Sequence, residues 1–364
     1  KVTTRSRKSN ERTYQNYFSL YSKKRKRRIV GKFFSELNIR GGLIMTLQFA
    51  TITGFFGQLK DRFKFYHETK ILEEKLSLIS QVEGNQGVEL IYPYDFKDKY
   101  QTKTQLEKNR LIGAAVNVDI KGEMVWNQRS LTALSAETRK KAFDYIAQGA
   151  EMSRFLGANL VTVCPLQDGY DYHFEVNYER SWQYLIDGLK EVAQSYPDVK
   201  ISIEYKFQEP LSHYLVGTAF NALYVCLKAN VPNLGVTLDF GHALQAGENP
   251  AETMTILARE NKLFHVHIND NDGKWDWDLI SGSRNLMSYL EFLYIMKKID
   301  YRGWIALDVT PRHRNPIEIF STSIYITKKL AKLAERLDEF PLQESMEKDS
   351  PQLIIRKIYD ELIK

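Results

Sequence analysis

The sequence predicts an α/β protein built as a parallel (β/α)8 TIM barrel with a basic N-terminal extension and a C-terminal helical tail. Short apolar runs rich in β-branched residues alternate with longer segments of helical period. Eight such runs follow Met45 within about 290 residues, a length that suits one barrel. Hydrophobic residues make up 43% of the 364 residues and charged residues 26%, which is typical of a globular core.

The predicted strands, in chain order, are Leu47–Thr53, Val88–Tyr92, Ala114–Ile120, Leu160–Cys164, Ile201–Lys206, Gly235–Phe240, Phe264–Ile268 and Trp304–Val309. Between them the helical period is clearest over Ala136–Leu156, where apolar residues recur every three or four positions. Glu179–Ala193 and Met287–Ile299 show the same period. In a barrel of this kind, reactive groups lie at the carboxyl ends of the strands.

Three parts of the chain are predicted: a basic extension over residues 1–44, a barrel domain over residues 45–339, and a linker with a helix over residues 340–364. The first 44 residues hold 13 Lys and Arg against two Glu, a net charge of +11, whereas the remainder has a net charge of −5. The run Lys23–Arg28 indicates a solvated arm; the alternative is an arm that binds nucleic acid, anionic lipid or a trafficking receptor. We expect Met45 to be the natural start and the arm to be dispensable.

The C-terminal tail begins with Asp338–Ser350, an acidic stretch interrupted by Pro341 that predicts a linker. Ser350 and Pro351 then predict a helix start, with Ser as the cap and Pro in the first turn. The apolar stripe of this helix would dock on its own barrel or on a neighbouring subunit, and we expect a homodimer or homotetramer. The stripe consists of Leu353, Ile354, Ile358 and Leu362.

Several classes of protein are excluded by composition. Cys164 and Cys226 are the two cysteines, which is too few for a thiolate zinc site and fits a reducing, cytoplasmic location. The apolar stretch Leu43–Phe56 is interrupted by polar residues and is shorter than the ~20 residues of a membrane span, so no membrane partner is expected.

Charged side chains accumulate at the predicted ends of strands five and six. Glu204 and Lys206 are two positions apart, so the alternation of a strand sends both toward the barrel interior. Asp239 ends the sixth strand, and Gly241 is expected to permit a turn that brings His242 back beside this carboxylate.

The ends of strands seven and eight add further candidates. His265 and His267 share one face of the seventh strand, and His267 lies nearer the reactive end. Asp276 and Asp278 follow in the next loop, and Asp308 lies among apolar neighbours at the end of strand eight.

So many carboxylates at one mouth would repel one another strongly unless cations compensate. Divalent metal is the simplest compensation, and oxygen ligands with some imidazole and no thiolate favour Mn²⁺, Co²⁺ or Mg²⁺ over structural zinc. We expect two ions per subunit, with Mn²⁺ favoured.

At these residues the chain resembles the xylose isomerase-like TIM-barrel superfamily, and more closely the metal-dependent aldose–ketose isomerases of the rhamnose isomerase type. The resemblance runs from Arg129 to Asp308 and includes the motifs Arg129-Ser130-Leu131-Thr132 and Gln167-Asp168-Gly169. It implies that a first, structural metal is held by Glu204, Asp239, His267 and Asp308. A second, catalytic metal would be held by His242, Asp276 and Asp278, with Asp239 as the bridge.

The resemblance also implies an activity, the metal-assisted shift of a hydride between C1 and C2 of an open-chain sugar, with no nucleotide cofactor. Lys206 corresponds to the family lysine that hydrogen-bonds the first oxygen of the substrate, and Asp276 or Asp278 would orient a water molecule. The flanking Trp275 and Trp277 would stack on a sugar face or hold the loop down.

Two departures leave the sugar and the ring-opening residue open. Xylose isomerases use a histidine–aspartate pair early in the barrel, and no equivalent stands out here after strands one or two. A histidine follows the Ser-Leu-Thr motif in the rhamnose type, whereas Ala133 stands here. His173 is a candidate for ring opening, and the alternative is a simple loop histidine. Arg312, His313 and Arg314 follow strand eight, where many barrels bind an anion, so a charged sugar is one option and an exposed basic turn the other.

Two alternatives remain. One is a single-metal epimerase or dehydratase of the same superfamily. The other is a non-enzymatic nucleic-acid binder that uses residues 1–44, which would show a steep salt dependence. The favoured partner is a small-molecule sugar, with no nucleic acid bound. Deletion of residues 1–44 separates these options, because an isomerase keeps its activity whereas a nucleic-acid binder loses its affinity.

Overall fold

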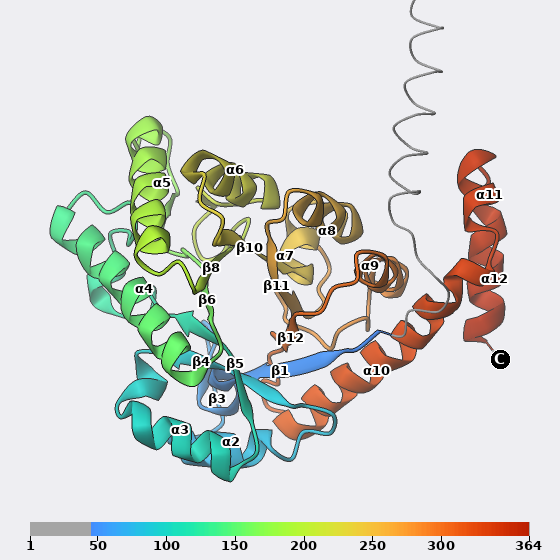
Figure 1. The fold of residues 1–364 in the computed structure, drawn as a ribbon, viewed down its shortest axis with the longest axis horizontal. Coiled ribbons are helices and arrows are strands. Elements are labelled where there is room, and N and C mark those ends of the chain that lie inside the picture. Colours follow the sequence, from blue (N-terminus) through green and yellow to red (C-terminus); the bar gives the residue numbers. More distant parts are fainter. Residues whose placement is uncertain (1–44, 364) are drawn as a thin grey trace, which may run out of the picture. The chain divides into compact units, whose positions relative to one another are not determined.

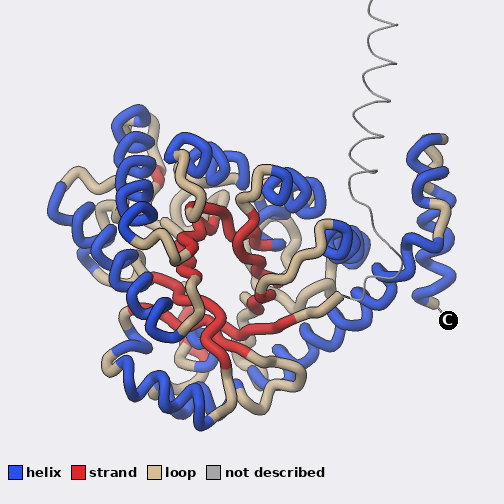
Figure 2. The backbone as a smooth tube through the Cα atoms, in the orientation of Figure 1, coloured by secondary structure: helices blue, strands red, loops and turns tan. Residues whose placement is uncertain are grey.

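The computed structural model describes residues 45–363, and the predictions for residues 1–44 lie outside the described residues. Eight parallel strands close into a barrel in the order β1-β12-β11-β10-β8-β6-β5-β4 (Figures 1 and 2). Their bounds are Gln48–Ile52 (β1), Gly87–Tyr92 (β4), Ile112–Val118 (β5), Leu160–Val163 (β6), Lys200–Glu204 (β8), Leu234–Asp239 (β10), Leu263–Ile268 (β11) and Trp304–Leu307 (β12). The predicted fold class is confirmed, and each barrel strand overlaps a predicted one.

Helices surround the ring of strands, except that the last two helices of the chain lie to one side of it (Figures 1 and 2). They are Leu72–Ile79 (α2), Lys99–Lys108 (α3), Ala136–Leu156 (α4), Tyr178–Ser195 (α5), Ala219–Ala229 (α6), Phe240–Gln245 (α7), Pro250–Arg259 (α8), Leu286–Lys298 (α9), Pro316–Arg336 (α10), Leu342–Glu347 (α11) and Gln352–Leu362 (α12). Short 3-10 helices span Thr53–Phe56, Tyr94–Phe96, Met124–Trp126 and Leu337–Glu339. None of the helices in the described part of the chain is both long and apolar enough to cross a membrane.

Two small antiparallel pairs lie outside the barrel. Leu59–Lys60 (β2) pairs with Phe65–Tyr66 (β3), and Gly169–Tyr170 (β7) pairs with His213–Tyr214 (β9). The second pair joins the segments that follow β6 and β8, so it fixes two loops of the carboxyl end against each other.

Local sequence signals explain the boundaries of α4. The Ser135 side chain accepts a hydrogen bond from the backbone N–H of Thr138 and caps the first turn. Gly157 ends the helix in the left-handed region, at φ 77°, where glycine is unstrained. The apolar face of α4, including Ala142 and Ile146, packs into the core between the helices and the strands.

The C-terminal tail differs from its prediction in two details. The expected linker contains the short helix α11, in which the Ser345 N–H donates to the Pro341 carbonyl. The predicted Ser cap of α12 is wrong, because the Ser350 hydroxyl donates to the Lys348 carbonyl and the helix begins beyond Pro351. The chain turns sharply before Ser350, and this turn uses the hydroxyl that would have capped the helix.

The terminal helix α12 contacts its own chain. Ile358 is buried in the main core, and Ile354 packs against it. Arg336 of α10 and Glu361 of α12 form an ion pair at 2.9 Å. Leu353 and Leu362, also in the predicted stripe, remain more than a third exposed. One side of the stripe is therefore docked, and contact of the other side with a second subunit stays a prediction.

Candidate metal centre

Four predicted residues meet at the carboxyl ends of β8, β10, β11 and β12, which are neighbours in the barrel. They are Glu204, Asp239, His267 and Asp308, and one ligand atom from each lies within 4.8 Å of the others. The sheet register places Asp239 beside His267. His267 Nδ1 lies 3.1 Å from Glu204 Oε1 and 3.6 Å from Asp308 Oδ2. The structure thus gathers the whole first set in one group, called the primary cluster below, in which Asp308 is partly exposed and the other three residues are buried.

A turn of helix brings His242 to the primary cluster. Asp239 is the residue before α7, and its carboxylate accepts the backbone N–H of His242 at 2.7 Å. His242 Nδ1 then lies 3.4 Å from Glu204 Oε1. Gly241 does not adopt a positive φ, so the expected reason for this glycine is wrong. Space explains it instead, because a Cβ at Gly241 would lie 2.2 Å from Asn269 Oδ1.

The loop after β11 carries the two remaining predicted carboxylates. Asp276 Oδ2 lies 3.0 Å from Lys206 Nζ and 3.0 Å from His242 Nε2. Asp278 accepts the Thr310 hydroxyl at 2.9 Å. The predicted second set is thus only partly brought together, since His242 and Asp276 are in contact whereas Asp278 is held by its own partner.

A buried amide occupies the space between two of the carboxylates. Asn269 Nδ2 lies 3.1 and 3.2 Å from the two oxygens of Asp239 and 3.5 Å from Asp278 Oδ1. The side-chain N–H groups partly neutralise these acids. Asn269 directly follows the predicted seventh strand, and it is a site residue that sequence reasoning missed.

One carboxylate fixes the loop that carries Asp276 and Asp278. Asp270 is buried and accepts the backbone N–H groups of Arg284 and Asn285, at 2.7 and 3.1 Å, together with the Asn285 side chain at 2.7 Å. The beginning of the loop is thereby joined to its end. This arrangement, called the Asp270 clamp below, holds both ends of the loop, so Asp276 and Asp278 between them are kept at the mouth of the barrel.

The site shifts the protonation of its own groups. Burial raises the pKa of Asp239 to about 6, and Asp308 and Glu204 add to the effect against the opposing charge of His242. Burial disfavours the charged form of His242, but Asp239 and Asp276 raise its pKa to about 10. Burial likewise opposes the charge on Lys206, yet Asp276 and Glu209 raise its pKa well above the ordinary value.

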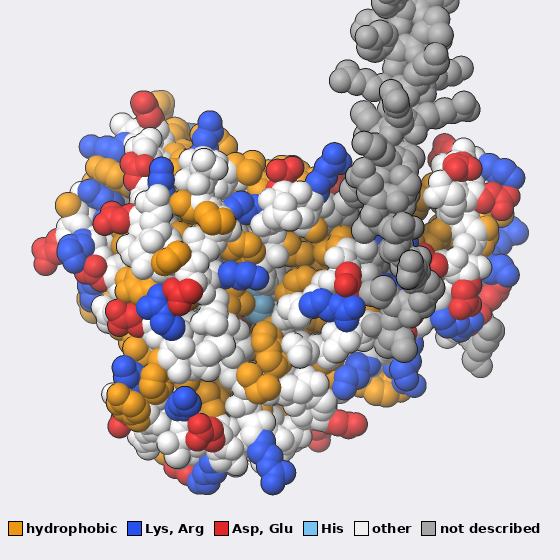
Figure 3. Space-filling model, in the orientation of Figure 1, with side chains coloured by type: hydrophobic (Ala, Val, Ile, Leu, Met, Phe, Trp, Pro, Cys, Tyr) orange, Lys and Arg blue, Asp and Glu red, His pale blue; other side chains and the backbone are white. Residues whose placement is uncertain are grey.

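The donors present fit divalent cations. Within the described residues, His242 Nδ1 and Asp276 Oδ1 are buried and lack a hydrogen-bond partner. Buried polar atoms normally have partners, so these two atoms have the free capacity that metal ligands need. Carboxylate oxygens and imidazoles without a thiolate suit Mn²⁺, Co²⁺ or Mg²⁺. A histidine is visible at the bottom of a hollow in the middle of the face in Figure 3.

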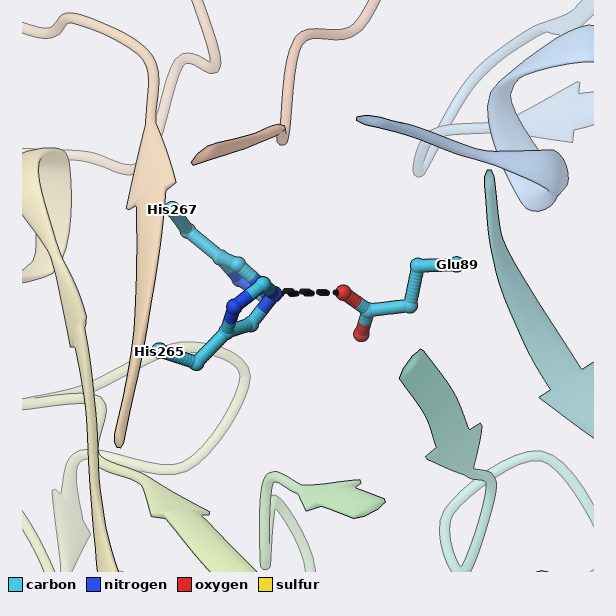
Figure 4. Close-up of side chains that lie close together, drawn as sticks. All are labelled: Glu89, His265 and His267. Atoms are coloured by element: carbon cyan, nitrogen blue, oxygen red, sulfur yellow. Dashed lines mark hydrogen bonds and ion pairs between the residues drawn. The ribbon is translucent and has the colours of Figure 1, made fainter. Parts of the chain in front are cut away.

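Glu89 was missed at the sequence level. It lies on β4, is fully buried, and contacts both His265 and His267 inside the barrel (Figure 4). An acidic residue inside an otherwise apolar predicted strand was a usable signal, because a buried carboxylate needs partners.

The two flanking motifs form one buried hydrogen-bond network. The Asp168 carboxylate accepts the hydroxyls of Ser130 and Thr132 and the backbone N–H groups of residues 130–132. The segments after β5 and β6 are therefore joined by one carboxylate. Ala133, the residue after Thr132, is also buried.

The other predicted candidates lie around the mouth. His173 is exposed and lines a surface hollow with Phe174 and Asn177, apart from the primary cluster. Trp277 donates its indole N–H to Asp272, and Arg312 stacks over its ring while donating to its carbonyl oxygen. These contacts support the interpretation of Trp277 as a residue that holds the loop.

The fold and the site together define a (β/α)8 barrel whose mouth carries carboxylates and imidazoles that could hold a metal ion. The family described as xylose isomerase-like TIM barrel matches residues 79–330, and the chain belongs to this family. Its members include sugar isomerases, epimerases and dehydratases.

Individual relatives are distant. A probable sugar isomerase of Mesorhizobium japonicum is 26% identical over 247 residues, covering 66% of this chain and 56% of the relative. Xylose isomerase of Thermus thermophilus is 25% identical over 180 residues, covering 48% and 44%. The matched region thus spans about half the length of these curated relatives. The crystal structure of a D-tagatose 3-epimerase-like protein superposes with a TM-score of 0.64 at 21% identity, over 80% of this chain and 99% of that one, which shows the fold.

Proposed function

We propose that this protein is a divalent-metal-dependent aldose–ketose isomerase that shifts a hydride between C1 and C2 of a sugar. The observation that carries the proposal is the primary cluster with the Lys206–Asp276 ion pair beside it. The names of the Mesorhizobium and Thermus relatives support the same class of reaction.

Each residue has a role that follows from its position. Glu204, Asp239, His267 and Asp308 would hold the first ion, and His242, Asp276 and Asp278 would hold the second together with Asp239. The ions, with Mn²⁺ favoured and Co²⁺ or Mg²⁺ as alternatives, supply Lewis acidity toward the carbonyl and hydroxyl oxygens of the sugar.

Lys206 supplies fixed positive charge. Its side chain is only 11% exposed, and its ammonium is kept charged by Asp276 and Glu209. An N–H donor in this position stabilises negative charge that develops on the first oxygen of the sugar. Asp276 or Asp278 would orient a water molecule. We further propose a cytoplasmic homodimer or homotetramer with no nucleic-acid partner.

A single-metal epimerase or dehydratase is the second candidate. It is favoured by one observation: the primary cluster is compact, whereas Asp278 of the second set is bound to Thr310. Such an enzyme removes a proton from carbon, whereas the proposed isomerase moves a hydride.

The deciding experiment incubates Mn²⁺- or Co²⁺-loaded protein with neutral and anionic sugars, using aldoses deuterated at C2 and ketoses dideuterated at C1. We expect an aldose–ketose pair to interconvert with the deuterium retained in the product. Loss of the label to solvent would contradict the hydride shift, and formation of an epimer or a dehydrated product in place of the aldose–ketose pair would support the second candidate. Failure of every sugar with folded, metal-loaded protein would refute the isomerase.

A further inference from the structure

A buried carboxylate lies beneath the primary cluster and contacts one of its members. Glu89 Oε2 lies 3.0 Å from His265 Nε2 and 3.1 Å from His267 Nε2 (Figure 4). Glu89, His265 and His267 are all fully buried. A single carboxylate oxygen therefore accepts from two imidazoles, one of which also faces the primary cluster.

The position of Glu89 is fixed from its other side as well. Glu89 Oε1 accepts the side-chain amide of Asn117 on β5 at 2.9 Å and the hydroxyl of Thr162 on β6. Donors from β5, β6 and β11 thus surround one carboxylate on β4. A carboxylate with donors on both oxygens has little freedom to rotate.

The two nitrogens of His267 face different groups. Nε2 faces Glu89, and Nδ1 faces Glu204 and Asp308 of the primary cluster. A neutral imidazole carries its proton on one nitrogen and a lone pair on the other. Donation from Nε2 to Glu89 places the lone pair on Nδ1, where a metal ion would need it.

The same three side chains could instead be ligands of a separate ion, because one ligand atom from each lies within 4.8 Å of the others. Such an ion would need the Nε2 lone pair of His267. A neutral His267 would then present Nδ1–H to Glu204 and Asp308 and could no longer bind metal in the primary cluster. The four donors already on Glu89 also leave it well satisfied without a metal.

We infer that Glu89 is a positioning residue, which holds His267 with Nδ1 directed at the metal of the primary cluster, while His265, Asn117 and Thr162 hold Glu89. This inference rests on the proposed function, because it requires an ion in the primary cluster. Carboxylates behind metal-binding histidines commonly raise metal affinity 10- to 100-fold.

The test titrates the metal-free full chain with Mn²⁺ and measures affinity and stoichiometry by calorimetry and by the EPR signal of free Mn²⁺. Glu89→Gln removes the charge with little change of shape, and Glu137→Gln on the exposed first turn of α4 is the matched control. We expect Glu89→Gln to weaken Mn²⁺ binding about 10- to 100-fold with unchanged stoichiometry, and the control to bind as the wild type does.

A second measurement determines the tautomer of His267 directly and does not require a Glu89 variant. Imidazole ¹⁵N NMR of the Mg²⁺-loaded wild type, with the signal identified through His267→Gln, should show the proton on Nε2. A proton on Nδ1 would overturn the inference even where Glu89→Gln does not fold.

The remaining outcomes distinguish failure of the positioning role of Glu89 from failure of the proposed function. Unchanged Mn²⁺ affinity in folded Glu89→Gln, or loss of one ion from the stoichiometry with the others unaffected, would overturn the positioning role and leave the proposed function standing. Absence of Mn²⁺ binding to the wild type would overturn both.

Discussion

Asp276 accepts two cationic partners on one oxygen, with Lys206 Nζ and His242 Nε2 each 3.0 Å from Oδ2. Burial disfavours the carboxylate, yet these partners lower the pKa of Asp276 below its usual range. Asp276 therefore stays ionised and links the lysine expected to bind the sugar to a histidine expected to bind metal.

Asp239→Asn should abolish tight binding of both ions, because Asp239 belongs to the primary cluster and would bridge to the second site. Turnover should fall with it. Mn²⁺ titration and sugar interconversion measure the two effects, and Asp187→Asn on the exposed face of α5 is the control. Retention of two tightly held ions would contradict the bridging role.

Lys206→Met should lower turnover by about 10²- to 10³-fold, because it removes a fixed donor near the developing charge. Metal affinity should be kept or rise, since a cation beside Asp276 has been removed. The comparison of kcat with the Mn²⁺ dissociation constant tests this, with the exposed Lys140→Met as control. Unchanged turnover in a metal-loaded variant would argue against Lys206 as a substrate-binding group.

The stabilisation by Mn²⁺ should increase with pH. The folded-state pKa of Asp239, about 6, lies above its ordinary value of 3.8. Its contribution to the stability of metal-free protein is thus complete at low pH and lost as the pH rises through about 6. Above this pH Asp239 is charged, and a bound cation compensates that charge. Below this pH a cation must displace the proton of Asp239 in order to bind.

Thermal unfolding with and without Mn²⁺ between pH 5 and 7.5 measures this effect. The shift in Tm should be small at pH 5 and large at pH 7.5, and Asp239→Asn should show no such increase. A shift that is constant across this range would be inconsistent with proton competition at Asp239.

Asp168→Asn should destabilise the fold by about 2–4 kcal/mol, because an amide nitrogen would face the N–H donors that the carboxylate accepts. Mn²⁺ affinity should change little, since Asp168 is outside the primary cluster. Chemical denaturation and Mn²⁺ titration separate the two properties. A large loss of metal with full stability would assign Asp168 a direct role at the centre.

Gly241→Ala should weaken Mn²⁺ binding and lower stability by about 1–3 kcal/mol, because its Cβ would displace Asn269 from Asp239. Asn269→Ala removes the nearer of the two clashing side chains, the other being Asn271, so the double variant should lose less stability than the sum of the two single changes. Denaturation of the three variants gives this coupling. Additive effects would show that the close approach does not matter.

Much of the fold could be predicted because barrel strands buried on both faces read as short apolar runs. The primary cluster was predictable for a related reason, since strand ends of one barrel meet at one edge and Glu204, Asp239, His267 and Asp308 lie at successive ends. The small helix α11 was not predicted, because its six residues carry too little periodic signal.

The residues that sequence analysis missed act through distant partners. Glu89 and His267 are 178 positions apart, and no local pattern connects them. The role of Gly241 also depends on a remote neighbour, Asn269, rather than on its own backbone conformation. The contact between Asp278 and Thr310 could not be predicted either, because Thr310 follows a different strand.

The Asp270 clamp has a consequence for how a sugar would enter. A loop tied at both ends by one buried carboxylate cannot swing open as a flap without breaking several hydrogen bonds at once. Asp276 and Asp278 would therefore be in place before a sugar binds. Entry of a substrate and release of a product would then depend on other segments at the mouth of the barrel.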